Sequence, residues 1–121
     1  MTNSDKLLER IIKRVNDGAD RFDITLTVGG ALITGRLTPR AAWLESNIAV
    51  LNDVESMKLF ADEFAAEGGS LDNEEYLHLT EAKTVFGVEI PIPTGAGFLR
   101  IPAVSVDAWS IGRVSIDRRG Q

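Results

Sequence analysis

Apolar residues recur at helical spacing near the start of the chain, and charged residues occupy the positions between them. The apolar stripe consists of Leu7, Leu8, Ile11, Ile12 and Val15. Ser4 precedes the stripe and suits a helix N-cap, and Gly18 can end a helix because glycine readily adopts positive φ. The pattern predicts a helix over residues 4–16 that covers one end of a sheet or barrel.

A second pattern, alternation of apolar and polar side chains, runs through residues 23–37 (DITLTVGGALITGRL) and is interrupted at Gly29 and Gly30. Two glycines between β-branched runs favour a tight hairpin, because its turn requires positive φ. Gly35 stands inside the second run and predicts a bulge or a sharp bend. Two strands are not stable alone, so we expect later strands to pair with this hairpin.

Residues 39–66 return to helical spacing. Thr38 can cap this segment and Pro39 fits its first turn. Two apolar stripes follow each other along it, which fits either two short helices or one bent helix. The segment holds more bulky apolar surface than one small core needs, so we expect part of it to stay exposed and drive self-association. The candidate protein-contact residues are Trp43, Met57, Phe60 and Phe64.

Strand-like alternation resumes over residues 75–116 and places His78 on the face opposite Leu77 and Leu79. Pro91 and Pro93 exclude their segment from a central strand, because proline cannot donate a ladder hydrogen bond. Two further glycines, Gly97 and Gly112, mark a turn and a bend.

With the hairpin, these runs give about five strands. The predicted fold class is α+β: an N-terminal helix on a strongly bent antiparallel five-stranded sheet or SH3/Sm-like small barrel. A helical insertion separates strands two and three. We expect one domain over residues 1–121, with a short tail at 117–121.

Composition narrows the function classes. The 121 residues are 44% apolar and include no cysteine, which excludes disulfides and thiolate metal sites. No apolar run reaches the roughly 20 residues of a membrane helix, and no signal-peptide pattern is present. We therefore expect a cytoplasmic protein without membrane insertion.

The net charge is −5, but residues 41–97 alone hold two basic and eleven acidic residues. A segment with this excess of negative charge repels the phosphate backbone of DNA and RNA, which argues against nucleic acid as a partner.

No chemical motif emerges. The single histidine, His78, cannot form a standard zinc site unaided, and we expect it to face solvent or a polar neighbour. The acidic run at 72–75 lacks the central glycine of a calcium loop, and the glycines at 95–97 lack a phosphate-loop lysine. We therefore predict no catalytic set, no metal and no cofactor. An enzyme that uses His78 with nearby carboxylates is the alternative that this residue leaves open.

Three elements together resemble the gas vesicle accessory protein U family: the hairpin at 23–35, the strand motif LHL at 77–79 and the ending VDAWSIGRVS at 106–115. The resemblance covers about two thirds of the chain. It implies a non-enzymatic accessory role in forming or organising gas vesicles, and hence a gas-vesicle-associated location. The implied partners are vesicle shell proteins or other accessory proteins, together with further copies of the chain in a homo-oligomer.

A weaker resemblance concerns the spacing of Gly30, Gly35 and Leu37, which is similar to the first motif of Sm-like small barrels. It implies a barrel and, as an alternative function, an RNA-binding module. That family continues with an Asp and a Met-Asn pair that touch RNA, whereas a helix is expected here. The basic residues available to such a module are Lys6, Lys13, Arg14, Arg100 and Arg113.

Overall fold

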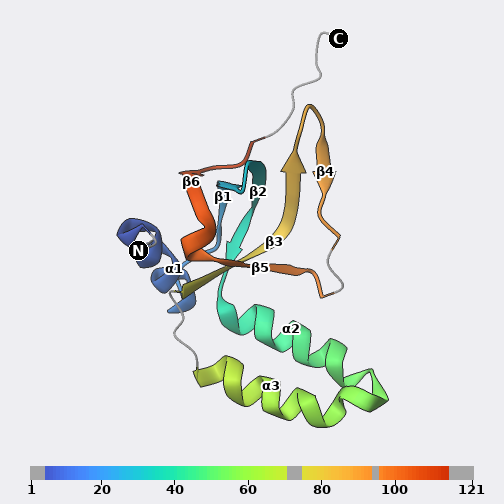
Figure 1. Cartoon of the computed structure of the whole chain (residues 1–121). Helices are drawn as coiled ribbons and strands as arrows, with labels where there is room; N and C mark the ends of the chain where they lie inside the picture. The colour runs from blue at the N-terminus through green and yellow to red at the C-terminus, as the bar shows by residue number, and fades with distance from the viewer. Residues whose placement is uncertain (1–4, 71–74, 94–95, 115–121) are drawn as a thin grey trace.

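The computed structural model describes residues 5–70, 75–93 and 96–114 (Figure 1). The described elements are α1 (Lys6–Asn16), β1 (Phe22–Val28), β2 (Ala31–Thr38), α2 (Arg40–Asn52), the 3₁₀ turn η1 (Glu55–Met57), α3 (Lys58–Ser70), β3 (Tyr76–Val85), β4 (Glu89–Pro91), β5 (Phe98–Pro102), the 3₁₀ turn η3 (Ala103–Ser105) and β6 (Val106–Ile111). The architecture is α+β, with α1 beside the sheet and the helical insertion between β2 and β3. The predicted tail at 117–121 lies outside the described residues.

The first helix is capped by Asp5 instead of the predicted Ser4, which lies outside the described residues. Asp5 Oδ1 accepts hydrogen bonds from the backbone N–H groups of Leu7 (2.7 Å) and Leu8 (3.4 Å). These bonds satisfy N–H groups that have no partner within the helix. The helix buries the side of its predicted stripe that carries Leu8, Ile12 and Val15.

The sheet has six strands instead of the five predicted, in the order β4-β3-β2-β1-β6, with β5 also paired to β3. All described pairings are antiparallel. The additional strand is β4, a three-residue edge strand that ends at Pro91. No described ladder joins the two ends of the sheet, so it is open, and a closed SH3/Sm-like barrel is not shown. The chain passes from β5 to β6 through η3, a turn of three residues, without pairing the two strands.

The main core lies between α1 and the concave side of the sheet. Its buried members are Leu8, Ile12, Val15, Ile24, Leu26, Leu37, Leu77, Leu79, Ala82, Ile101 and Ala103. They come from α1 and from four strands, together with the first residue of η3. Burial of these side chains is the main favourable term that holds α1 on the sheet, since each large one contributes roughly 1.5–3 kcal/mol.

The strong bend of β3 starts at a bulge opposite Gly35. Thr34 pairs with Lys83 and Arg36 pairs with Thr80, so two residues of β3 face Gly35 alone. One of them, Glu81, has a φ of 54°, which is unusual for a residue with a side chain. A Cβ at Gly35 would lie 3.3 Å from Ala82 Cα, Leu79 Cβ and Thr80 O. A side chain here would require these neighbours to shift by a few tenths of an ångström, so glycine favours the close approach of β2 and β3.

The glycines of the β1–β2 turn, Gly29 and Gly30, have φ values of 56° and 86°. The ladder closes at Val28 and Ala31, so these two residues form the turn alone. Gly97 and Gly112, the remaining predicted turn positions, also have positive φ.

The insertion forms two helices, which resolves the choice that the sequence left open. Figure 1 shows α2 and α3 as an antiparallel hairpin below the sheet, joined through η1. We call this unit the helical hairpin. Pro39 is the N-cap of α2, and no side-chain hydrogen bond caps it there. Instead, Asn16 Oδ1 at the end of α1 accepts a 2.7 Å hydrogen bond from the Arg40 backbone N–H. The start of α2 is thereby fixed to α1.

None of the helices in the described ranges is both long enough and apolar enough to cross a membrane.

Replacing Gly35 by Ala tests the close approach of β2 and β3. The added methyl group would force the surrounding backbone apart, and overpacking of this kind costs about 1–3 kcal/mol. We expect urea unfolding to give a lower midpoint with an unchanged slope. Ser110→Ala, at an exposed position of β6, is the control and should change the free energy of unfolding by less than about 0.5 kcal/mol. Equal stability of Gly35→Ala and the wild type would contradict the bulge as described.

Candidate functional site

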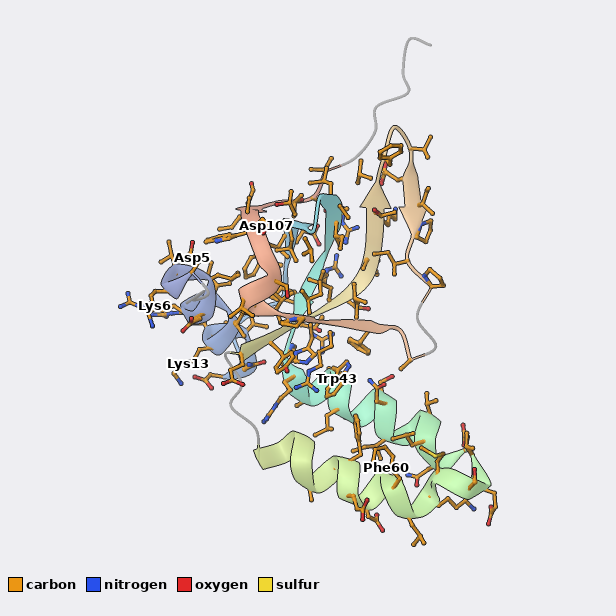
Figure 2. The ribbon with its side chains drawn as sticks, in the orientation of Figure 1. Asp5, Lys6, Lys13, Trp43, Phe60 and Asp107 are labelled. Atoms are coloured by element: carbon orange, nitrogen blue, oxygen red, sulfur yellow. The ribbon has the colours of Figure 1, made fainter. Side chains whose placement is uncertain are left out.

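The helical hairpin meets the sheet at Trp43, which lies in the first turn of α2 and is only 7% exposed (Figure 2). Its ring centroid is 5.5 Å from that of Phe64 on α3 and 4.9 Å from that of His78 on β3. Trp43 therefore connects both helices of the hairpin to the sheet. Trp43 and Ala61, the buried apolar residues of the hairpin, lie outside the main core, so this junction is a second packing centre.

Arg100 of β5 completes the junction. Its guanidinium carbon lies 4.4 Å from the centre of the Trp43 ring and 3.9 Å from that of Tyr76. A cation against an aromatic face contributes about 0.5–2 kcal/mol, with the upper end for desolvated pairs. Burial lowers the pKa of Arg100, and the charge of Arg40 adds to that effect. We call Trp43, Tyr76, His78 and Arg100 the junction cluster.

His78 is the most enclosed polar residue of the junction cluster. It is 1% exposed, and neither ring nitrogen has a hydrogen-bond partner among the described residues. Burial, and then the positive charges of Arg100 and Arg40, lower the pKa of His78 to about 3. The imidazole is therefore neutral at neutral pH and packs as an aromatic ring.

The expectation that His78 faces solvent was wrong, whereas it does have polar neighbours in Arg100 and Arg40. Alternation correctly separated His78 from Leu77 and Leu79, but all three side chains are buried. The face that carries His78 is covered by Trp43 of the helical hairpin. A pattern within one strand does not show which other element covers its second face. Tyr76 lies two positions before His78 and therefore on the same face of β3. A bulky aromatic residue at that position was the sequence signal that this face is not fully exposed to solvent.

The predicted contact residues fall into two groups. Trp43 is buried, and Phe64 is half-buried against it and against Phe60, whose ring centroid lies 6.0 Å from that of Phe64. Met57 is half-buried, whereas Phe60 is 39% exposed. The most exposed apolar residue of the hairpin is Leu59, at 85%. Together with Val50, Val54 and Phe60 it forms what we call the apolar tip.

The sheet carries a second set of exposed apolar residues. Phe86, in the turn between β3 and β4, is 87% exposed, and Val88 and Ile90 follow at 39% and 49%. Their exposure was not predicted from the sequence.

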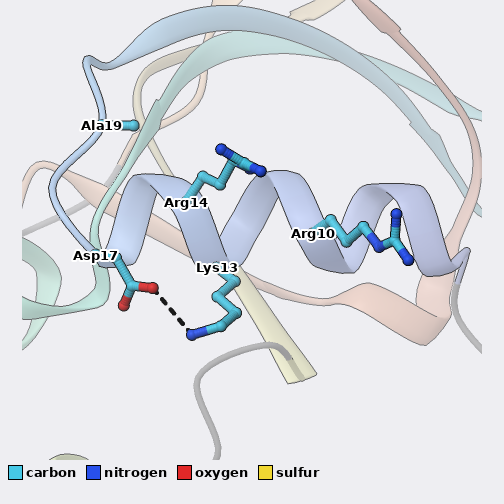
Figure 3. Close-up of a pocket in the computed structure, with 5 residues that line it drawn as sticks. All are labelled: Arg10, Lys13, Arg14, Asp17 and Ala19. Atoms are coloured by element: carbon cyan, nitrogen blue, oxygen red, sulfur yellow. Dashed lines mark hydrogen bonds and ion pairs between the residues drawn. The ribbon is translucent and has the colours of Figure 1, made fainter.

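The basic residues proposed for RNA are mostly engaged within the chain. Arg100 is held between two rings, Arg113 Nη1 donates to the backbone oxygen of Glu81, and Lys13 Nζ forms a 2.9 Å ion pair with Asp17. Lys6 and Arg14 are exposed on α1. An open hollow on α1, lined by Arg10, Lys13, Arg14, Asp17 and Ala19, is shown in Figure 3.

The described ranges contain no group of three or more His, Cys, Asp or Glu side chains placed to hold a metal ion. His78, the candidate general base, is enclosed by Trp43 and two arginines instead of carboxylates. The geometry therefore supports packing at the junction cluster, and it leaves the exposed surfaces of the helical hairpin and of α1 for contacts with other molecules.

Comparison with known proteins gives one family. The family model described as "Gas vesicle protein GvpU-like" matches residues 5–114. No curated protein and no solved structure matches the chain. The match spans all described elements, from the N-cap of α1 to the residues after β6.

The burial of His78 predicts a pH dependence of stability. The unfolded chain binds a proton at His78 below about pH 6.5, whereas the folded chain does so only near pH 3. The free energy of unfolding therefore falls as the pH decreases through this window. For this residue the slope is at most about 1.4 kcal/mol per pH unit.

His78→Phe keeps an aromatic ring at the junction and removes the titration. Urea unfolding across the window should show a shallower loss of stability in this variant than in the wild type. Asp5 contributes an acid-side loss to both proteins, because its pKa is lowered by the hydrogen bond from Trp109 and those from the helix backbone. Parallel curves for wild type and variant would show that His78 does not titrate as the structure requires.

Proposed function

The chain belongs to the GvpU-like gas vesicle protein family, and from this membership we propose that it is a non-enzymatic accessory protein in the formation or organisation of gas vesicles. It acts through protein–protein contacts and self-association. The observation that carries the proposal is the extent of the family match, over residues 5–114. The partners are gas vesicle shell proteins or other accessory proteins of the vesicle.

The helical hairpin is the contact surface in this proposal. Its apolar tip exposes Leu59 at 85% and Val54 at 45%, on a unit that projects from the sheet (Figure 1). Clustered exposed apolar side chains of this kind typically mark protein interaction sites. Met57, two residues before Leu59 in the chain, adds an adaptable side chain to this surface.

Trp43 and Phe64 have a different part in the proposal. They hold the hairpin against the sheet through the junction cluster, so the tip is presented in a defined direction. A rigidly presented surface loses less conformational entropy on binding than a flexible one. The sheet is thus the carrier, and the hairpin makes the contact.

Flotation tests this function. Gas vesicles are buoyant, so a protein bound to purified vesicles rises with them while unbound protein stays below. We expect the wild-type chain to rise with the vesicles in a saturable manner. Recovery of the wild type only from the lower fraction, at every concentration, would contradict the proposed function.

Leu59→Asp localises the contact to the apolar tip. The substitution places a charge where the partner would bury an apolar side chain, and we expect the apparent Kd for vesicles to rise at least about tenfold. Phe86→Asp is the matched control, because Phe86 is equally exposed but lies on the sheet. If Phe86→Asp weakens binding and Leu59→Asp does not, the contact lies on the sheet instead.

A further inference from the structure

The outer face of α1 carries cations that the described chain does not neutralise. Lys6, Arg10 and Arg14 are exposed, and none of them forms an ion pair with a described residue. Arg10 and Arg14 line the hollow of Figure 3. Leu7, at the same end of the helix as Lys6, is 57% exposed. The face therefore combines unpaired positive charge with one exposed apolar side chain.

The helical hairpin has the complementary character. Its exposed carboxylates without an ion pair to a described residue are Glu45, Asp53, Asp62 and Glu63. Glu45 lies on α2, Asp62 and Glu63 lie on α3, and Asp53 directly follows the last residue of α2, next to Val54 of the apolar tip. Within the described part of the hairpin, Lys58 is the exposed cation, and its Nζ is already held 2.8 Å from Glu55 Oε2. An apolar surface with surplus negative charge is the complement of α1.

The basic face of α1 and the apolar tip do not meet within one molecule. In Figure 1, α1 lies at the left beside β6 and β1, while the turn between α2 and α3 lies at the lower right, at the end of the hairpin farthest from α1. The start of α2 is fixed by the bond from Arg40 to Asn16 and by the junction cluster, so the tip cannot swing to α1.

We propose that the basic face of α1 in one copy binds the acidic helical hairpin of a second copy. Leu7 packs against the apolar tip, and the cations of α1 pair with Asp53 and Asp62. This inference rests on the self-association in the proposed function and names the surfaces that carry it. Because the two surfaces differ, the contact is head-to-tail, and each added copy leaves one surface of each kind free. The contact therefore builds chains or closed rings instead of an isolated dimer.

Charge reversal tests the pairing. The variant Arg10→Glu/Arg14→Glu places two carboxylates on α1 where the wild type has cations. The variant Asp53→Arg/Asp62→Arg places two cations on the hairpin where the wild type has carboxylates. Each alone should raise the concentration for half-maximal self-association at least about tenfold, as measured by sedimentation velocity and light scattering. An equimolar mixture should recover association, because the new carboxylates on α1 of one variant meet the new arginines on the hairpin of the other.

Net charge needs its own control. Arg10→Gln/Arg14→Gln and Ala31→Glu/Ala108→Glu shift the net charge by the same amount, and the second pair lies at exposed positions of β2 and β6. Only Arg10→Gln/Arg14→Gln should weaken self-association. Failure of the mixed variants to recover, or equal effects of the two charge-matched variants, would overturn the inference.

Flotation of the same variants separates this inference from the proposed function. Arg10→Glu/Arg14→Glu should still rise with the vesicles while it no longer self-associates. A wild-type chain that rises with vesicles but remains a monomer at all concentrations overturns the inference and leaves the proposed function intact. Recovery of association in the mixture without any flotation supports the inference and contradicts the function.

Discussion

The close approach of β2 and β3 at Gly35 is the constraint on which the rest of the fold depends. Without a Cβ at this position, two residues of β3 can face one residue of β2, and Glu81 takes a positive φ. Beyond this bulge β3 changes direction. Its first half pairs with β5 and its second half with β4, along the same edge. The bulge therefore separates the half of β3 that pairs with β5, where Arg100 meets the helical hairpin, from the half that pairs with β4.

The junction cluster converts this sheet geometry into a defined position for the hairpin. Trp43 contacts both His78 and Arg100, which stand opposite each other in the β3–β5 ladder. A buried imidazole without hydrogen bonds costs stability, but stacking on Trp43 and burial of the neutral ring offset that cost. The single histidine is thus part of the junction cluster. This cluster supports the helical hairpin, whose exposed residues, Leu59 above all, are available to partners.

The pattern of residues along the chain predicted those helices, turns and bends that depend on residues close to each other in the sequence. The stripe of α1, the turn at Gly29-Gly30 and the bend at Gly35 can all be read from spacing alone. Burial of Trp43 and His78 could not be read in this way, because each is covered by an element distant in the chain. The sixth strand was missed because β4 has three residues and ends at Pro91. The family was recognisable because its glycines and strand residues are themselves local features.

The central claim is that the helical hairpin, carried by the sheet, contacts the vesicle. Hydrogen–deuterium exchange of the full chain, with and without purified gas vesicles, tests it directly. We expect slower exchange on vesicle binding in peptides that cover η1 and the described part of α3, around Leu59 and Phe60, with β1 and β2 unchanged. Protection confined to the β3–β4 turn around Phe86, with no change in the hairpin, would contradict it.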